Sequence, residues 1–269
     1  MTTTGQFLYE ATNTLQSSGI PSARLDVLVL MEDALETDRA HLLAHLSDPL
    51  PNDKLAVLHT RITQRKSHLP LAYILGHAPF YGRRFTVSEH VLVPRPETET
   101  MIDMLKRLPL PDRPRLADIG TGSGSIGITA GLELPGSTVH LYDLDKNALY
   151  LARHNTRRHA LQAELYQSDL LTNWYGPYDA ILTNLPYVPD YLPVNKAASF
   201  EPRLALFAGA DGMDLYKRFW RQVNQLADPP RFILTESLAF QHHALALIAR
   251  KAGYVLSGRE ALIQTFERG

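Results

Sequence analysis

A glycine-rich stretch, followed about 20 positions later by an acidic residue, is the first feature with chemical meaning. The stretch is Asp118-Ile119-Gly120-Thr121-Gly122-Ser123-Gly124, and Asp143 ends the next apolar segment. Glycines let the backbone turn sharply against a ligand, and an acid after the next strand can accept hydrogen bonds from both hydroxyls of a ribose. The pattern predicts an adenosine-bearing ligand, although the glycines could also serve only tight packing of a strand against a helix.

The spacing of these glycines separates the candidates for that ligand. It departs from G-x-G-x-x-G, although Gly122, Gly124 and Gly127 come close to it, and no G-K-[ST] follows as in a phosphate-binding loop. Asp118 would repel a pyrophosphate but suits the amino group of a methionine moiety. The stretch therefore favours S-adenosylmethionine over NAD.

A second candidate site is the segment Asn184-Leu185-Pro186-Tyr187, which follows a later apolar segment. Methyl transfer to a planar nitrogen is difficult because the lone pair of that nitrogen is delocalised. The side-chain oxygen of Asn184 and the backbone carbonyl of Leu185, presented by the extended conformation that Pro186 imposes, can accept both N–H bonds and orient the nitrogen. Tyr187 can stack on the planar group. The same residue types are also ordinary turn formers at the end of a strand.

From Arg115 onward the apolar pattern alternates between strands and helices. Repeated strand–helix units predict a parallel sheet with helices on both faces, and the short polar turn between the last two strands predicts an antiparallel edge. Both candidate loops then lie at the carboxyl ends of strands, and the segment 184–212 is too long for a simple connector. The predicted strands are 116–119, 138–142, 164–167, 178–183, 231–235, 254–257 and 261–266.

The residues before Arg115 follow other patterns. Residues 1–75 have helical spacing with proline and glycine breaks, and they predict a small helical bundle. Residues 76–114 predict short strands at 80–87 and 91–93, a helix from Glu97 to about Leu108, and a proline-rich linker. We therefore expect an N-terminal helical domain (1–75), a β-hairpin with a linker helix (76–114) and a donor-binding sheet (115–269).

The composition excludes several classes of protein. The 269 residues include no cysteine, which excludes disulfide frameworks, iron–sulfur clusters and thiolate nucleophiles. The net charge of −1 provides no global basic field for nucleic acid. No apolar run approaches the roughly 18 residues of a membrane span, and the N-terminus lacks the basic region of a signal peptide. We expect a cytoplasmic monomer without a metal, a membrane contact or a direct nucleic-acid partner.

Four segments taken together resemble the PrmC/HemK methyltransferases, which modify the glutamine of the GGQ motif in peptide chain release factors. The segments are 92–99, 118–124, 184–187 and 201–206. The resemblance spans essentially the whole chain. It implies an α/β fold: a class I, Rossmann-like seven-stranded S-adenosylmethionine-dependent methyltransferase domain, with a small N-terminal helical bundle that helps to grip the release factor. The implied reaction is methyl transfer to the side-chain amide nitrogen, N5, of that glutamine.

The resemblance also implies a role for each site residue. The glycines would lie along the methionine and ribose of the donor, Asp143 would bind the ribose hydroxyls, and residues 168–170 would flank the adenine. The target amide would be held by Asn184, Leu185, Pro186 and Tyr187, with Asn184, Pro186 and Tyr187 as the catalytic residues. The expected donor-binding residues are Asp118, Gly120, Thr121, Gly122, Ser123, Gly124, Asp143, Asp169, Leu170 and Asn184.

Three positions depart from the family pattern. Leu185 stands where the family usually has Pro, but the backbone carbonyl needed there survives the change. Leu170 stands where the family often has an aromatic residue, and Glu236-Ser237-Leu238 stands where it tends to have Glu-Ile-Gly.

Other functions fit the same residues. A DNA or RNA adenine-amine methyltransferase makes the same demands on a planar nitrogen, although the near-zero net charge argues against it. Methylation of a glutamine in another protein also fits. A third possibility is a non-enzymatic assembly factor that uses the helical domain and keeps a relic donor pocket.

Overall fold

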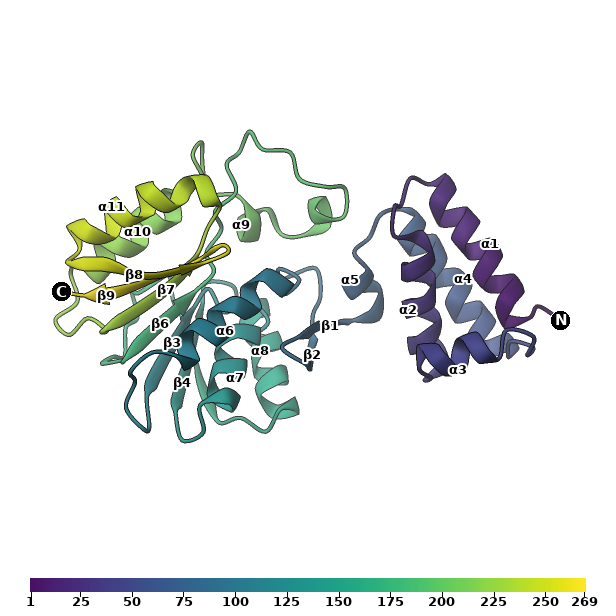
Figure 1. Ribbon diagram of the computed structural model, residues 1–269, viewed down its shortest axis with the longest axis horizontal. Coiled ribbons are helices and arrows are strands. Elements are labelled where there is room, and N and C mark those ends of the chain that lie inside the picture. Colours follow the sequence, from purple (N-terminus) through teal and green to yellow (C-terminus); the bar gives the residue numbers. More distant parts are fainter. The chain divides into compact units, whose positions relative to one another are not determined.

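The computed structural model describes residues 1–269, and its contacts divide the chain into two compact units (Figure 1). The first unit contains residues 1–76 and 195–200, and the second contains residues 77–194 and 201–269. The hairpin and linker helix, which we expected as a separate region, therefore belong to the second unit.

Eleven α-helices and nine strands make up these units. None of the helices is both long enough and apolar enough to cross a membrane. The helices are α1 (Thr4–Ser17), α2 (Ala23–Leu35), α3 (Arg39–Ala44), α4 (Asn52–Lys66), α5 (Leu71–Leu75), α6 (Glu99–Lys106), α7 (Ser125–Glu133), α8 (Lys146–Arg158), α9 (Arg203–Leu206), α10 (Asp214–Val223) and α11 (His242–Lys251), with 3₁₀ turns η1 (Pro96–Thr98), η2 (Ala198–Phe200) and η3 (Ala239–Gln241). The strands are β1 (His77–Phe80), β2 (Arg83–Thr86), β3 (Arg115–Ile119), β4 (Thr138–Asp143), β5 (Ala163–Gln167), β6 (Ala180–Thr183), β7 (Phe232–Glu236), β8 (Tyr254–Glu260) and β9 (Ile263–Arg268).

The first unit is a helical bundle of α1 to α5, as its apolar spacing predicts. Thr3 and Gln6 cap α1 reciprocally, each side chain accepting a hydrogen bond from the backbone of the other. Inside the bundle, Asp26 of α2 and Arg65 of α4 form a buried ion pair at 2.7 Å. The apolar residues of this core that are completely buried are Leu15, Val27, Leu30, Met31 and Leu58.

A seven-stranded sheet in the order β5-β4-β3-β6-β7-β9-β8 organises the second unit. The strands β3 to β7 pair in parallel. Strand β9 runs antiparallel to β8, as predicted from the short turn between them, and also to β7. Strand order reverses between β3 and its neighbour β6. The loops that follow these two strands therefore leave the sheet side by side, at its topological switch point.

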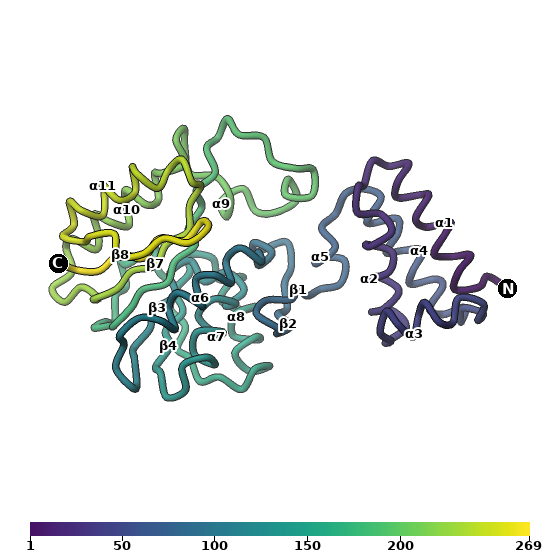
Figure 2. Tube along the Cα trace, in the orientation of Figure 1, coloured from purple at the N-terminus to yellow at the C-terminus, as the bar shows by residue number.

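Helices cover both faces of this sheet because its strands carry apolar side chains on both faces. Leu116 of β3 packs on the face covered by α6 and α7, whereas Ala117 and Ile119 pack on the face covered by α10 and α11. Figure 1 shows these two helical layers on opposite sides of the sheet. The Cα trace shows the segment between β6 and α10 as a long excursion that carries the short helix α9 (Figure 2).

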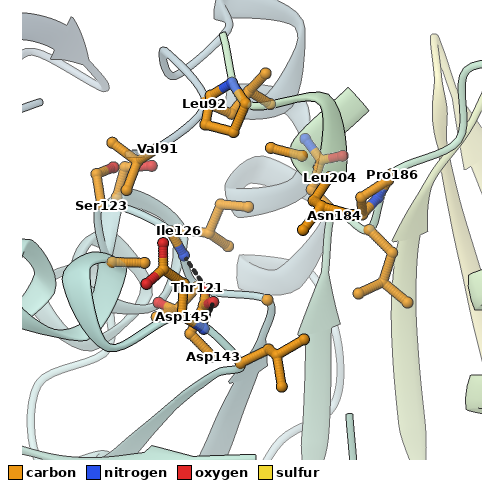
Figure 3. A pocket seen from close by; sticks show the side chains of 18 of the residues that line it. Val91, Leu92, Thr121, Ser123, Ile126, Asp143, Asp145, Asn184, Pro186 and Leu204 are labelled. Atoms are coloured by element: carbon orange, nitrogen blue, oxygen red, sulfur yellow. Dashed lines mark hydrogen bonds between the residues drawn. The ribbon is translucent and has the colours of Figure 1, made fainter. Parts of the chain in front are cut away.

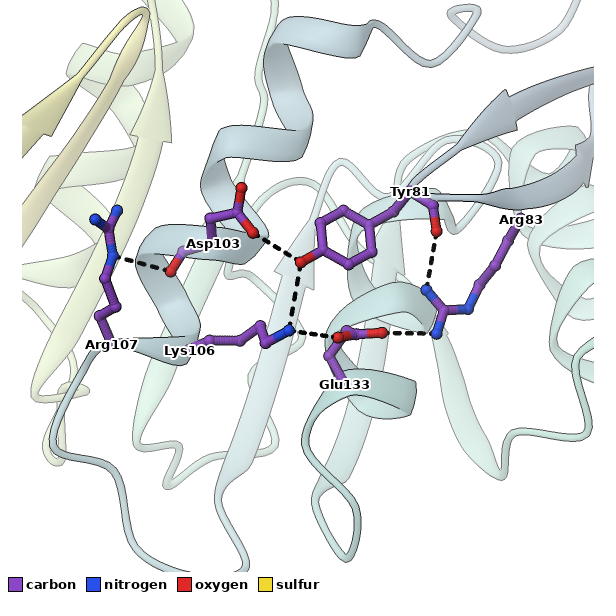
Figure 4. A network of polar contacts seen from close by, with 6 residues as sticks. All are labelled: Tyr81, Arg83, Asp103, Lys106, Arg107 and Glu133. Carbon is purple, nitrogen blue, oxygen red and sulfur yellow. Dashed lines mark hydrogen bonds and ion pairs between the residues drawn. The ribbon is translucent and has the colours of Figure 1, made fainter.

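The β1–β2 hairpin packs against the helices of the second unit. Around its turn, the Tyr81 hydroxyl donates to Asp103 of α6 at 2.7 Å. Arg83 and Lys106 both pair with Glu133 of α7, at 2.7 Å and 2.6 Å (Figure 4). These contacts tie the hairpin to α6 and α7.

The prediction of a strand at 91–93 is wrong. Residues 91–93 pair with no strand, and the N–H of Val93 donates instead to Glu201 at 3.1 Å. Pro94 and Pro96 follow directly and lack the N–H groups that a ladder needs. The predicted helix after them is present, as the turn η1 and then α6, which ends two residues earlier than expected.

Candidate active site

The loops after β3 and β6 form facing walls of one cavity of about 470 Å³. We call residues 120–124 the glycine loop and residues 184–187 the Asn184 loop. Figure 3 shows Thr121 and Asp143 on one side of the cavity and Asn184 and Pro186 on the other. Residues 90–92, 94–95 and 202–205 also line it. The two motifs that the sequence singled out are thus brought together.

Asp118 braces the glycine loop from below and does not line the cavity. Its side chain is completely buried, and its Oδ2 accepts hydrogen bonds from the Thr121 hydroxyl at 2.6 Å and from the Gly127 N–H at 2.8 Å. Burial raises the pKa of Asp118 to about 6. This placement favours a bracing role, and contact of Asp118 with the donor amino group stays a prediction.

Glycines make this brace possible. Gly120, Gly122 and Gly124 all have positive φ, which only glycine adopts readily. A Cβ on Gly127 would lie 2.4 Å from Leu141 and 2.8 Å from the Cβ of Asp118, so only glycine lets α7 pack this closely on the sheet. The glycines therefore serve tight packing as well as a ligand surface.

Asp143 lines the cavity at the end of β4, as predicted. Its Oδ2 accepts a hydrogen bond from the Gly122 N–H at 2.8 Å and its Oδ1 accepts one from the Asp145 N–H at 2.9 Å. Burial raises the pKa of Asp143, although these N–H groups oppose the shift. Because each carboxylate oxygen has a second lone pair, Asp143 can still accept two hydroxyl donors from a ligand.

Residues 168–170 line the adjoining part of the cavity. Leu170 is buried and has a positive φ of 56°, which is unusual for a branched side chain. Asp169 pairs with Arg218 of α10. Together with Leu144, Leu170 provides an apolar surface of the kind that an aromatic base requires.

The Asn184 side chain is oriented by a neighbour far away in the sequence. Its Nδ2 donates to the Thr98 hydroxyl at 3.3 Å, and both residues line the cavity. The amide nitrogen only donates, so the amide oxygen is the atom that can accept hydrogen bonds. Leu185 and Pro186 also line the cavity.

Tyr187 lies behind the cavity wall instead of lining it. Its hydroxyl donates to the Glu236 carboxylate at 2.9 Å, and its carbonyl accepts a hydrogen bond from Gln241 Nε2 at 2.8 Å. Glu236 is completely buried at the end of β7, and burial raises its pKa although Thr98, Tyr187 and Asn184 oppose the shift. The geometry therefore favours a supporting role for Tyr187 over stacking on a substrate.

Sequence reasoning missed three of these supports: Thr98, Glu236 and Gln241. Glu236 carried a usable signal, since an acid at the carboxyl end of a strand next to β6 must lie near the switch point. Arg95, at the wall of the cavity, pairs with the buried Glu201 at 2.6 Å. That ion pair holds the segment before α6 to the segment before α9.

Two family models match this chain. The PrmC N-terminal domain matches residues 6–76, and the methyltransferase small domain matches residues 98–198. Proteins named release factor glutamine methyltransferase are similar over most of their length. The one from Deinococcus radiodurans is 31% identical over 97% of this chain and 98% of its own length. The one from Koribacter versatilis is 37% identical over 82% of this chain and 81% of its own.

This chain belongs to the release factor glutamine methyltransferase family. The resemblance seen in the sequence motifs is thereby confirmed, and so is the α/β methyltransferase fold. Solved structures show the same fold at low sequence identity. A methyltransferase from Pyrococcus furiosus superposes with a TM-score of 0.53 at 15% identity, covering 78% of this chain and 98% of that one. A Thermus thermophilus 16S rRNA methyltransferase, solved with AdoMet and guanosine, gives 0.50 at 16% identity, covering 72% and 50%.

Proposed function

We propose that this family member transfers the methyl group of S-adenosylmethionine to the side-chain amide nitrogen, N5, of the glutamine in the GGQ motif of class 1 release factors. The observation that carries the proposal is the meeting of the glycine loop and the Asn184 loop in one cavity, in a chain that belongs to this family. The two loops supply a donor side and an acceptor side that face each other.

The residues of the donor side fit S-adenosylmethionine. The cavity volume of about 470 Å³ lies in the range of small-molecule sites. Asp143 has lone pairs for two ribose hydroxyls, and Leu144 and Leu170 offer apolar surface for the adenine. When bound there, S-adenosylmethionine supplies an electrophilic methyl group.

The residues of the acceptor side orient an amide nitrogen. The Asn184 side-chain oxygen and the Leu185 carbonyl would accept its two N–H bonds, which aligns the nitrogen with the methyl group and favours pyramidal geometry. Thr98 keeps the Asn184 amide in the required orientation. No strong base is needed during transfer, because the nitrogen loses its proton after it has been methylated, and that proton passes to water.

The test uses labelled S-adenosylmethionine and the unmodified release factor of the host. We expect the release factor to become labelled, and we expect no label when its GGQ glutamine is changed to asparagine. Donor binding without label on the factor would contradict the proposed substrate, and label on RNA or DNA instead would revive the adenine-amine alternative.

A further inference from the structure

Asn155 is a completely buried polar residue for which the proposed reaction has no use. It lies within α8, and its side-chain amide bonds the backbones of two segments that are remote from it in sequence. Its Oδ1 accepts from the Thr86 N–H at 2.8 Å. Its Nδ2 donates to the Thr86 carbonyl at 2.9 Å and to the Ser123 carbonyl at 2.8 Å. Both N–H donors of the amide and its oxygen are thus in use.

The two segments continue into neighbouring parts of the cavity wall. Thr86 ends β2, and the chain runs on to His90, Val91 and Leu92, which line the cavity. Ser123 belongs to the glycine loop and lines the cavity itself. The two parts approach each other at Gly122, where an added Cβ would lie 4.0 Å from the Cβ of Val91. Asn155 therefore spans the two parts from behind.

Helix formation alone does not explain an asparagine at this position. Asparagine is a poor helix former, because its side chain competes for backbone hydrogen bonds. A leucine of similar size would remove the partner of the buried Ser123 carbonyl and the partners of the partly buried Thr86 N–H and carbonyl. The polar contacts at Tyr81, Arg83 and Lys106 (Figure 4) use side chains that are not fully buried, where such contacts are weak, whereas Phe80 and Phe85 fix the hairpin by packing in the apolar core.

We infer that Asn155 is a positioning residue that holds the hairpin side and the glycine-loop side of the donor cavity at the separation that S-adenosylmethionine requires. The inference rests on the proposed function. Asn155 touches no reacting group, so its loss weakens binding of the donor and of the product S-adenosylhomocysteine, and leaves the rate of the fully loaded enzyme nearly unchanged.

The experiment compares N155L, which removes all three hydrogen bonds, with N155D, which keeps only the acceptor for the Thr86 N–H. Thr156→Val is the matched control, since the buried Thr156 hydroxyl bonds only to Arg153 of its own helix. Calorimetry with S-adenosylhomocysteine should show Kd raised about 10-fold or more in N155L and in N155D, because the second carboxyl oxygen of the aspartate would face the Thr86 and Ser123 carbonyls with no N–H to donate. In the control, Kd should stay within about twofold. At saturating donor, kcat should stay within about threefold and KM for the release factor should not change.

Folded N155L or N155D protein that binds S-adenosylhomocysteine like wild type would overturn the inference, and so would a loss of kcat at unchanged Kd. If N155L does not fold, the affinity of N155D for S-adenosylhomocysteine tests the inference by itself. The proposed function fails separately: wild-type protein that binds the donor but methylates no release factor refutes the substrate, while the calorimetry still decides the role of Asn155.

Discussion

The glycine loop is held mainly by residues close to it in the chain, whereas the Asn184 loop is held by residues from distant segments. Asp118 bonds groups only three and nine positions away, and Asp143 reaches Gly122 across 21. The contacts of the Asn184 loop with Thr98, Glu236 and Gln241 span 86, 49 and 54 positions. The donor side is thus largely one strand–turn–helix unit, and the acceptor side exists only once the sheet is assembled.

The largest effect is expected from a change in the Asn184 loop, which should alter catalysis but not donor binding. Asn184→Ala removes the acceptor of the substrate N–H and should lower kcat by about 10²–10³-fold, as the loss of one preorganised hydrogen-bonding group does in other enzymes. Affinity for S-adenosylhomocysteine should stay within about threefold, because all the other expected donor-binding residues lie outside the Asn184 loop. Radiolabel transfer and calorimetry measure the two quantities. Retained turnover would contradict the role of Asn184.

The converse change acts on the donor side. Asp143→Ala removes the ribose acceptor and the partner of the Gly122 N–H, and it should raise the Kd for S-adenosylhomocysteine by about 10–100-fold. Saturating donor should restore most of kcat. A variant with a normal Kd and a low kcat would show that the two sides are not separable in this way.

The buried carboxylate beneath the glycine loop should give the ligand-free protein a measurable pH dependence. The folded pKa of Asp118, about 6, lies above its ordinary value of 3.8, so the folded state holds the proton more tightly. Its contribution to stability is therefore full below pH 3.8 and is lost as the pH rises to about 6, by roughly 2–3 kcal/mol. Denaturant unfolding of wild type and Asp118→Asn across this window isolates the effect. If the free energies of unfolding of the two proteins change with pH in the same way, the prediction is wrong.

The contact of Glu236 with Tyr187, which supports the Asn184 loop, should have a smaller effect, on catalysis alone. Glu236→Gln keeps the shape but replaces the carboxylate that accepts from Tyr187, and we expect kcat to fall about 10-fold with donor affinity unchanged. Tyr187→Phe should act similarly, and the double variant should lose less than the product of the two factors, since both changes weaken the same contact. Multiplicative losses would indicate independent roles.

The smallest effect is expected at the hairpin network of Figure 4, where the Lys106 ammonium and the Arg83 guanidinium lower the pKa of Glu133. These side chains are partly exposed, so Glu133→Gln should cost only about 0–1 kcal/mol of unfolding free energy. Donor affinity should not change. A loss of several kcal/mol in thermal or denaturant unfolding would mean that the network contributes more than surface ion pairs usually do.

What the sequence could predict follows the same division between near and distant contacts. The alternation of strands and helices, the antiparallel edge and the glycine turn could be predicted because each rests on local periodicity or on glycine at fixed spacing. The inward or outward placement of Asp118 and Tyr187 could not, because it depends on which side of a turn a neighbouring helix or strand occupies. The absence of a strand at 91–93 likewise depends on Glu201, more than 100 positions away, which takes the N–H of Val93.

The position of β9 has a consequence for biosynthesis. This strand, residues 263–268, pairs with β7 on one side and with β8 on the other, so it is interior to the sheet although it is made after every other strand. Helices α1 to α5 make contacts over short stretches of chain and can fold while translation continues. The sheet cannot be completed until residues 263–268 have been synthesised. Until then β7, which carries Glu236, has no partner strand on one side.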